Sequence, residues 1–266
     1  MSNNVDSNLA LFCDFENIAL GVRDAKYAKF DINRILERLL VKGSIVVKKA
    51  YCDWERYRDF KATMHGAAFE LIDIPHVRQS GKNSADIRMV VDALDLCYTK
   101  MHVNTFVIIS GDSDFSPLVS KLRENAKTVI GVGVKNSTSD LLISNCDEFI
   151  YYDDLVREQK KSRTARKKTK GRSAKAKSGP QKEKDKAQEG IDLALEAARA
   201  LNAERGDREK LWGSMVKQTL KRQRPGFSES FYGFDSFSEL LEEARERGQI
   251  TLELDERSGG YIIRNL

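Results

Sequence analysis

The sequence has little of the residues that build metal–thiolate sites or disulfide frameworks. Its 266 residues include four cysteines and three histidines, scattered along the chain. No two cysteines form a CxxC pair, and the histidines show neither an HExxH motif nor another metal-ligand spacing. We therefore expect Cys13, Cys52, Cys97 and Cys146 to be reduced core residues of an intracellular protein.

Long apolar runs are also missing. No stretch approaches the ~18 residues that a membrane-spanning helix needs, which excludes a transmembrane protein. The first eight residues are polar and lack the basic start and apolar core of a signal peptide. We expect a cytoplasmic protein without a membrane partner. Hydrophobic residues still make up 41% of the chain, which is enough for a packed core in one large domain or two smaller ones.

The positive charge is concentrated in one segment. The whole chain has a formal net charge of +5, but residues 157–186 alone hold 14 basic and three acidic residues, between two mildly acidic blocks. Because this segment has no large apolar residue, it cannot bury enough surface to offset the entropy of ordering it. We interpret residues 157–187 as a basic disordered linker.

Two functions fit such a linker. It is either a spacer that its like charges keep extended, or an arm that binds RNA or DNA by releasing counterions. The density of lysine and arginine favours the arm, with Lys167 and Lys168 among the expected RNA contacts. In a nucleated cell the same run would also fit an import signal.

The N-terminal block, residues 8–156, alternates short apolar strands with helical patterns. Strands are predicted at 9–13, 45–51, 69–74, 105–109, 128–134 and 148–151. Helices are predicted at 32–41, 56–67, 84–101, 117–125 and 140–145. The apolar stripe of the longest helix is expected to comprise Ile87, Val90, Val91, Leu94 and Tyr98. Such alternation, without strict in/out periodicity in the strands, indicates an α/β fold with a parallel sheet covered on both faces.

The C-terminal block, residues 188–266, has a different pattern. Helices are predicted at 189–204, 211–222 and 237–247. Two short strands, 250–254 and 261–263, follow and are joined by a Ser258-Gly-Gly260 turn. Helices followed by a small hairpin indicate a winged helix-turn-helix domain.

Acidic residues concentrate where the predicted strands end. Asp14 and Glu16 follow the first strand, Asp112 and Asp114 follow the most apolar strand, and Asp86 opens the helix before it. Ligands of an open parallel sheet bind beyond the carboxyl ends of its strands. If these segments are neighbours in the sheet, Asp14, Asp86, Asp112 and Asp114 converge on one pocket.

Such a group of carboxylates would repel one another unless a cation neutralised them. Hard oxygen ligands select Mg²⁺ or Mn²⁺, often with waters retained for phosphate chemistry. A bound ion of this kind acidifies water and neutralises charge on a phosphate under attack, which is the chemistry of phosphodiester hydrolysis. One such aspartate would more simply be a helix cap or turn residue. Three acidic clusters favour a metal site over that alternative.

Three motifs carry a family resemblance: Asp14-Phe-Glu-Asn17, Gly81-Lys-Asn-Ser-Ala-Asp86, and Ser110-Gly-Asp-Ser-Asp-Phe115 with Leu122-Arg-Glu124. In this order they resemble the NYN domain, a PIN-like nuclease fold, of the LabA/DUF88 type, over about residues 8–155. The resemblance implies a metal-dependent ribonuclease. It assigns the acidic centre to Asp14, Asp86, Asp112 and Asp114, and supporting roles to Asn17, Lys82 and Ser110. Some PIN-like proteins have lost activity, so a non-catalytic RNA-binding or adaptor protein on the same scaffold stays an alternative.

A second resemblance covers about residues 207–264. The stretches Leu211-Trp-Gly-Ser-Met215, Arg224-Pro-Gly-Phe227 and Tyr232-Gly-Phe234 resemble the OST-HTH/LOTUS domain. The resemblance implies binding of RNA, expected to be single-stranded, or docking to a protein partner. A local basic cluster would contact the phosphate backbone; its members are Lys217, Lys221, Arg222 and Arg224. An NYN domain followed by this module is a known pairing.

Overall fold

The computed structural model describes residues 7–27, 29–75, 84–157, 180–205, 210–255 and 258–264, without the side chains of 180–184 and Arg205. The chain divides into two compact units, with the division after Arg157. Among the described helices, none is long and apolar enough to cross a membrane.

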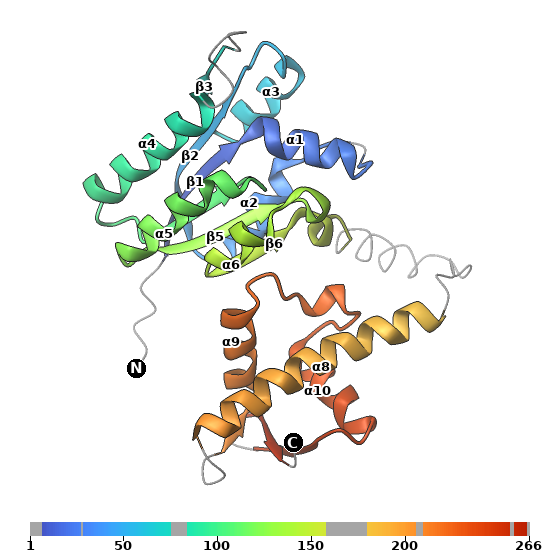
Figure 1. Ribbon diagram of the computed structural model, residues 1–266. Coiled ribbons are helices and arrows are strands. Elements are labelled where there is room, and N and C mark those ends of the chain that lie inside the picture. The colour runs from blue at the N-terminus through green and yellow to red at the C-terminus, as the bar shows by residue number, and fades with distance from the viewer. Residues whose placement is uncertain are drawn as a thin grey trace. The chain divides into compact units, whose positions relative to one another are not determined.

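A six-stranded parallel sheet forms the centre of the N-terminal unit (Figure 1). Its strands are β1 (Asn8–Asp14), β2 (Ser44–Cys52), β3 (Glu70–Asp73), β4 (Thr105–Ile109), β5 (Thr128–Gly133) and β6 (Glu148–Tyr151). They lie in the order β3-β2-β1-β4-β5-β6, so the chain changes direction of winding between β1 and β4. The strands and the parallel α/β arrangement expected from the sequence are confirmed. Ligands of such sheets bind at the carboxyl edge of this switch point.

Helices cover both faces of the sheet, because each buried strand is apolar on both sides. One face packs against α1 (Phe15–Asp24), α2 (Ile32–Leu40) and α3 (Arg58–Gly66). The other packs against α4 (Ser84–Thr99), α5 (Ser116–Glu124) and α6 (Asp140–Asn145). Along β1, Leu11 and Cys13 join the first core, whereas Ala10 and Phe12 join the second. All four cysteines are buried and free, as expected.

Helix α1 was not among the predicted helices. It begins directly after β1, and the carboxylate of Asp14 accepts a hydrogen bond from the Asn17 amide as its N-cap. Its buried side chains include Phe15, Ile18 and Val22, at helical spacing. The signal was present in the sequence, but without an intervening loop the helix merges with the strand pattern.

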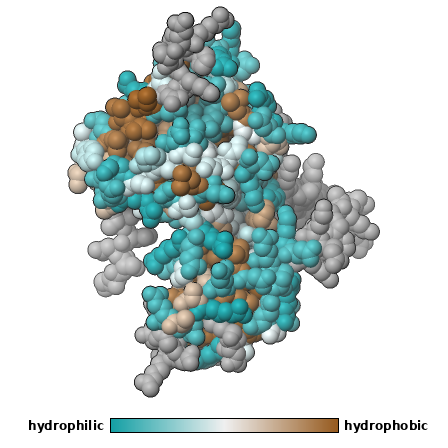
Figure 2. All heavy atoms as spheres, viewed as in Figure 1, coloured by the Kyte–Doolittle hydropathy of each residue, from teal (hydrophilic) through white to brown (hydrophobic). Residues whose placement is uncertain are grey.

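The predicted apolar stripe of α4 was right in part: Val90 and Leu94 pack against the core, but the centre of the buried face lies elsewhere on the helix. The buried residues of α4 are Met89, Ala93 and Cys97, at i, i+4 and i+8. In contrast, Ile87 and Tyr98 are 63% and 59% exposed. Figure 2 shows a brown patch at the upper left, on the side of the N-terminal unit where Figure 1 places α4. This helix is apolar on more than one side, so periodicity alone does not select the buried face.

The described part of the C-terminal unit contains three longer helices and a small antiparallel sheet. Its elements are α8 (Pro180–Arg205), β7 (Leu211–Trp212), α9 (Gly213–Gln223), α10 (Phe237–Glu246), β8 (Thr251–Leu254) and β9 (Tyr261–Arg264). The strand order is β7-β9-β8. This unit also contains the short 3-10 helix η3 (Glu229–Phe231), and the N-terminal unit contains η1 (Ser113–Phe115) and η2 (Lys135–Ser137).

Two features of this unit differ from the sequence-based expectation. Residues Leu211–Trp212, expected to begin a helix, instead pair with β9 as strand β7. Helix α8 begins at Pro180, so residues 180–187 of the expected linker are helical. Lys167 and Lys168 lie outside the described residues.

Candidate active site

A hollow of about 270 Å³ brings together side chains from the carboxyl edge of the sheet. Asp14 ends β1, Asp112 follows β4, and Asp86 lies in the first turn of α4; all three line the hollow. The order of the sheet explains this convergence, because β1 and β4 are adjacent strands. The fourth expected carboxylate, Asp114, is exposed within η1 and is not part of this lining.

Asp14 is the most buried carboxylate of the hollow, with 8% of its surface exposed. Its Oδ1 accepts a hydrogen bond from the Asn17 amide at 3.3 Å, and its Oδ2 accepts one from Ser110 Oγ at 3.0 Å. Burial, and then the negative charges of Asp86 and Asp112, raise the pKa of Asp14 to about 7, although the two hydrogen bonds oppose this rise. The site therefore favours an added positive charge, either a proton or a cation.

Asp86 experiences the same electrostatic environment. Burial is the first cause that raises the pKa of this carboxyl, followed by the charges of Asp112, Asp114 and Glu16. Asp114 therefore lies within electrostatic reach of the hollow. The four predicted carboxylates form one mutually repelling group, of which three share a common wall.

Short-range hydrogen bonds hold the two strand ends together. Ser110 Oγ accepts the Asp112 amide at 3.2 Å, and Asn17 Oδ1 accepts the Gly111 amide at 2.9 Å. A Cβ atom at Gly111 would lie 2.4 Å from the carbonyl oxygen of Ser137, so only glycine fits this crossing. Asn17 lines the hollow and Ser110 bonds to Asp14, whereas Lys82 lies outside the described residues; the supporting roles of these three residues stay predictions.

The donor chemistry of the hollow fits a hard divalent cation. Carboxylate oxygens are the ligands that Mg²⁺ and Mn²⁺ prefer, and a cation would relieve the repulsion that raises the Asp14 pKa. In the part of the chain that the structure describes, no three histidine, cysteine, aspartate or glutamate side chains form a group that could hold a metal ion. The metal-ligand assignment of Asp14, Asp86, Asp112 and Asp114 stays a prediction.

Two further carboxylates line the hollow, and neither is among the site residues predicted from the sequence. Glu16 forms an ion pair with Arg56 at 3.2 Å, which partly neutralises it. Asp53 follows β2 directly, which is the same strand-end signal that identified Asp14 and Asp112. Its Oδ1 accepts the Glu55 amide at 3.1 Å, so it also shapes the turn after β2.

The predicted basic cluster of the C-terminal unit is split by ion pairs. Lys217 Nζ lies 2.8 Å from the carboxylate of Glu229, and Arg224 lies 3.5 Å from that of Glu196. The other two, Lys221 and Arg222, occupy the last turn of α9. These two are therefore the better candidates for contact with a phosphate.

Residues 8–153 match the family model of the NYN domain. Uncharacterized protein MJ0482 of Methanocaldococcus jannaschii is 24% identical over 165 residues, which cover 59% of this chain and 63% of that protein. The chain thus spans less than two thirds of that relative. The crystal structure of VPA0982 from Vibrio parahaemolyticus, a protein of unknown function, is similar at 28% identity and a TM-score of 0.51, over 58% of this chain and 98% of the other. Because the family match extends over more than half of its length, the chain belongs to the NYN domain family, within the PIN-like nuclease superfamily.

Proposed function

We propose that this protein is a ribonuclease that hydrolyses RNA phosphodiester bonds with Mg²⁺ or Mn²⁺ as its cofactor. One observation carries the proposal: the buried carboxylate of Asp14 shares a hollow with Asp86 and Asp112 at the switch point of the sheet. Membership of the NYN family supports nuclease chemistry at this place.

The residues of the hollow would have three roles: metal binding, proton transfer and contact with the phosphate. Asp14, Asp86 and Asp112, with Asp114 beside them, would hold the divalent ion, which supplies an acidified water and neutralises phosphate charge. One of these carboxylates would take the proton of the attacking water. Because Asn17 Oδ1 is engaged by the Gly111 amide, its side-chain NH₂ is the group that would donate to a phosphate oxygen.

Asp112→Asn tests the assignment. The asparagine retains an oxygen that can accept the Asp114 amide, so the turn of η1 is preserved while the charge is lost. With labelled single-stranded RNA and Mn²⁺, we expect cleavage to fall by at least about 100-fold, with a melting temperature close to that of the wild type. Asp95→Asn, on the exposed side of α4, is the matched control and should cleave normally.

Assays of the wild-type protein distinguish a ribonuclease from a non-catalytic RNA-binding protein. Metal-dependent breakdown of RNA that EDTA stops supports the ribonuclease, and undiminished cleavage by Asp112→Asn would refute the role of this carboxylate. Binding of several RNA substrates without any breakdown would instead support a non-catalytic RNA-binding or adaptor protein. A parallel DNA oligonucleotide shows which nucleic acid is preferred.

For the C-terminal unit we propose a winged-helix module of the OST-HTH/LOTUS type that binds single-stranded RNA. The order of α9, α10 and the β8–β9 hairpin supports this architecture. Lys221 and Arg222 at the end of α9 would contact the phosphate backbone, and the basic segment before α8 would add non-specific attraction. Docking of a protein partner on this unit is the alternative outcome of the binding test.

A further inference from the structure

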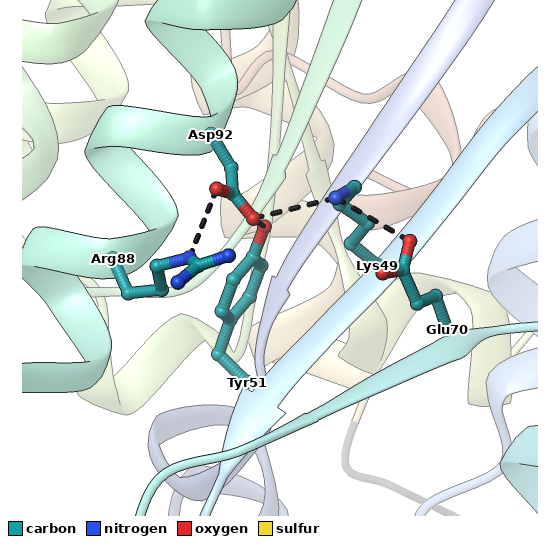
Figure 3. Close-up of polar contacts among 5 residues, drawn as sticks. All are labelled: Lys49, Tyr51, Glu70, Arg88 and Asp92. Atoms are coloured by element: carbon teal, nitrogen blue, oxygen red, sulfur yellow. Dashed lines mark hydrogen bonds and ion pairs between the residues drawn. The ribbon is translucent and has the colours of Figure 1, made fainter.

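A mostly buried carboxylate joins α4 to the sheet (Figure 3). The side chain of Asp92, 13% exposed, accepts hydrogen bonds from Tyr51 Oη at 2.9 Å and from Lys49 Nζ at 3.3 Å, both on β2. Arg88, one turn earlier on α4, donates to its other oxygen at 3.0 Å. Lys49 also lies 3.3 Å from Glu70 on β3. The network therefore links α4, β2 and β3.

The strand register relates this network to the hollow. In the parallel ladder of β1 and β2, Tyr51 is the partner of Asp14, and Tyr51 itself lines the hollow. Asp92 lies on the same helix as Asp86, six residues further along. The Tyr51–Asp92 hydrogen bond thus connects the strand position beside Asp14 to the helix that carries Asp86.

Few of the other contacts of α4 are directional: near its C-terminal end, Tyr98 Oη accepts a long hydrogen bond from Asn125 Nδ2 at 3.4 Å. The buried residues of α4, Met89, Ala93 and Cys97, pack against the sheet through apolar contacts, which do not fix the rotation of a helix as a hydrogen bond does. Meanwhile Asp86, in its first turn, faces the like charges of Asp112 and Asp114. Without the bonds of Asp92, only side-chain packing would oppose a small rotation of the N-terminal half of α4 that moves Asp86 away from them.

We propose that Tyr51 and Asp92 are positioning residues, which hold α4 in the rotation that places Asp86 in the hollow with Asp14. The link to metal binding rests on the proposed function, whereas the link between Tyr51 and the position of α4 does not. Lys49 and Arg88 donate to the two oxygens of Asp92 and so orient its carboxylate towards the tyrosine hydroxyl.

Tyr51→Phe in the full chain tests the proposal, because it removes only the hydroxyl. Tyr27→Phe is a matched control: Tyr27 Oη donates to Asp153 at 2.9 Å, the same kind of bond at the same distance, away from the hollow. Two quantities are measured. Mn²⁺ affinity is followed by electron paramagnetic resonance of the free ion, and hydrogen exchange of residues 84–92 is followed in EDTA.

We expect Tyr51→Phe to weaken Mn²⁺ binding roughly tenfold and to speed amide exchange in the first half of α4, as loss of an outer partner of a metal ligand does. Tyr27→Phe should leave both quantities within about twofold of the wild type while losing similar thermal stability. Asp92→Asn should reproduce the effects of Tyr51→Phe, because the neutral amide no longer attracts Lys49 and Arg88.

Mn²⁺ affinity and amide exchange of α4 together distinguish failure of the positioning role from failure of the metal-dependent function. Equal affinity and equal exchange in the Tyr51 and Tyr27 variants would overturn the positioning role. Faster exchange of α4 in a protein whose wild type binds no Mn²⁺ would retain the mechanical link and refute the metal-dependent function.

Discussion

Ser110 Oγ donates a hydrogen bond to Asp14 Oδ2 across 96 residues of sequence, at 3.0 Å. The same hydroxyl accepts the Asp112 amide, and Ser110 has no exposed surface. One buried side chain therefore joins the ends of β1 and β4 and sets the separation of two predicted site residues. Its loss should affect stability and the hollow together.

Replacing Ser110 by alanine leaves a buried carboxylate oxygen and a backbone amide short of a partner. We expect the free energy of unfolding to fall by about 1–3 kcal/mol, measured by urea denaturation. Ser116→Ala is the matched control. Among the described residues Ser116 Oγ is buried and has no hydrogen-bond partner, so its removal should cost close to nothing. Equal losses in the two variants would contradict a specific role for the Ser110 bond.

The raised pKa of Asp14 should make the stability of the metal-free protein, measured in EDTA, depend on pH. This pKa rises from 3.8 to about 7 on folding, first because of burial and then because of Asp86. Between these values the folded chain binds more protons than the unfolded chain, so this carboxyl lowers stability as pH rises from 3.8 towards 7. Asp14→Asn cannot ionise and should be more stable than the wild type at pH 8, by an amount on the order of 3 kcal/mol.

Thermal melts of both proteins from pH 4 to pH 8 check this expectation. Their difference should widen with pH and level off above the folded pKa. Asp95→Asn, at an exposed carboxyl, should follow the wild type throughout. A constant difference between Asp14→Asn and the wild type would mean that Asp14 titrates with the same pKa in the folded and unfolded chains.

The sequence predicted the convergence of Asp14, Asp86 and Asp112 only on the condition that their segments are neighbours in the sheet, a condition that the adjacent strands β1 and β4 fulfil in the structure. It did not predict that α4 presents Ile87 and Tyr98 to solvent, since two apolar stripes compete on that helix and tertiary packing chooses between them. Contacts between distant segments give no local signal at all. The bond from Tyr51 to Asp92 spans 41 residues, and periodicity carries no information about it.

The same limit applies to the basic residues of α9, which leads to a prediction about RNA affinity. Lys221→Gln with Arg222→Gln should weaken binding of single-stranded RNA and lower the slope of log affinity against log salt by about 1.4, at roughly 0.7 for each phosphate that is no longer neutralised. Lys217→Gln should instead act mainly on stability, because Lys217 is paired with Glu229 at 2.8 Å. Fluorescence anisotropy across a salt series separates the two outcomes. A larger decrease in affinity from Lys217→Gln would instead assign the phosphate contact to Lys217, which lies one turn before Lys221 on the same face of α9.

The basic segment before α8 makes a parallel prediction that distinguishes an RNA-binding arm from a spacer. Lys167→Gln with Lys168→Gln keeps the chain length and removes two charges from the densest run of lysine and arginine. If both lysines contact phosphates, the salt slope should again fall by about 1.4, and RNA of any sequence should be affected equally, because phosphate contacts carry no base information. Lys100→Gln, at an exposed position after α4, controls for the loss of a lysine charge outside the segment. An unchanged slope would assign the segment to spacing alone, and the affinity would then come from the two units that it joins.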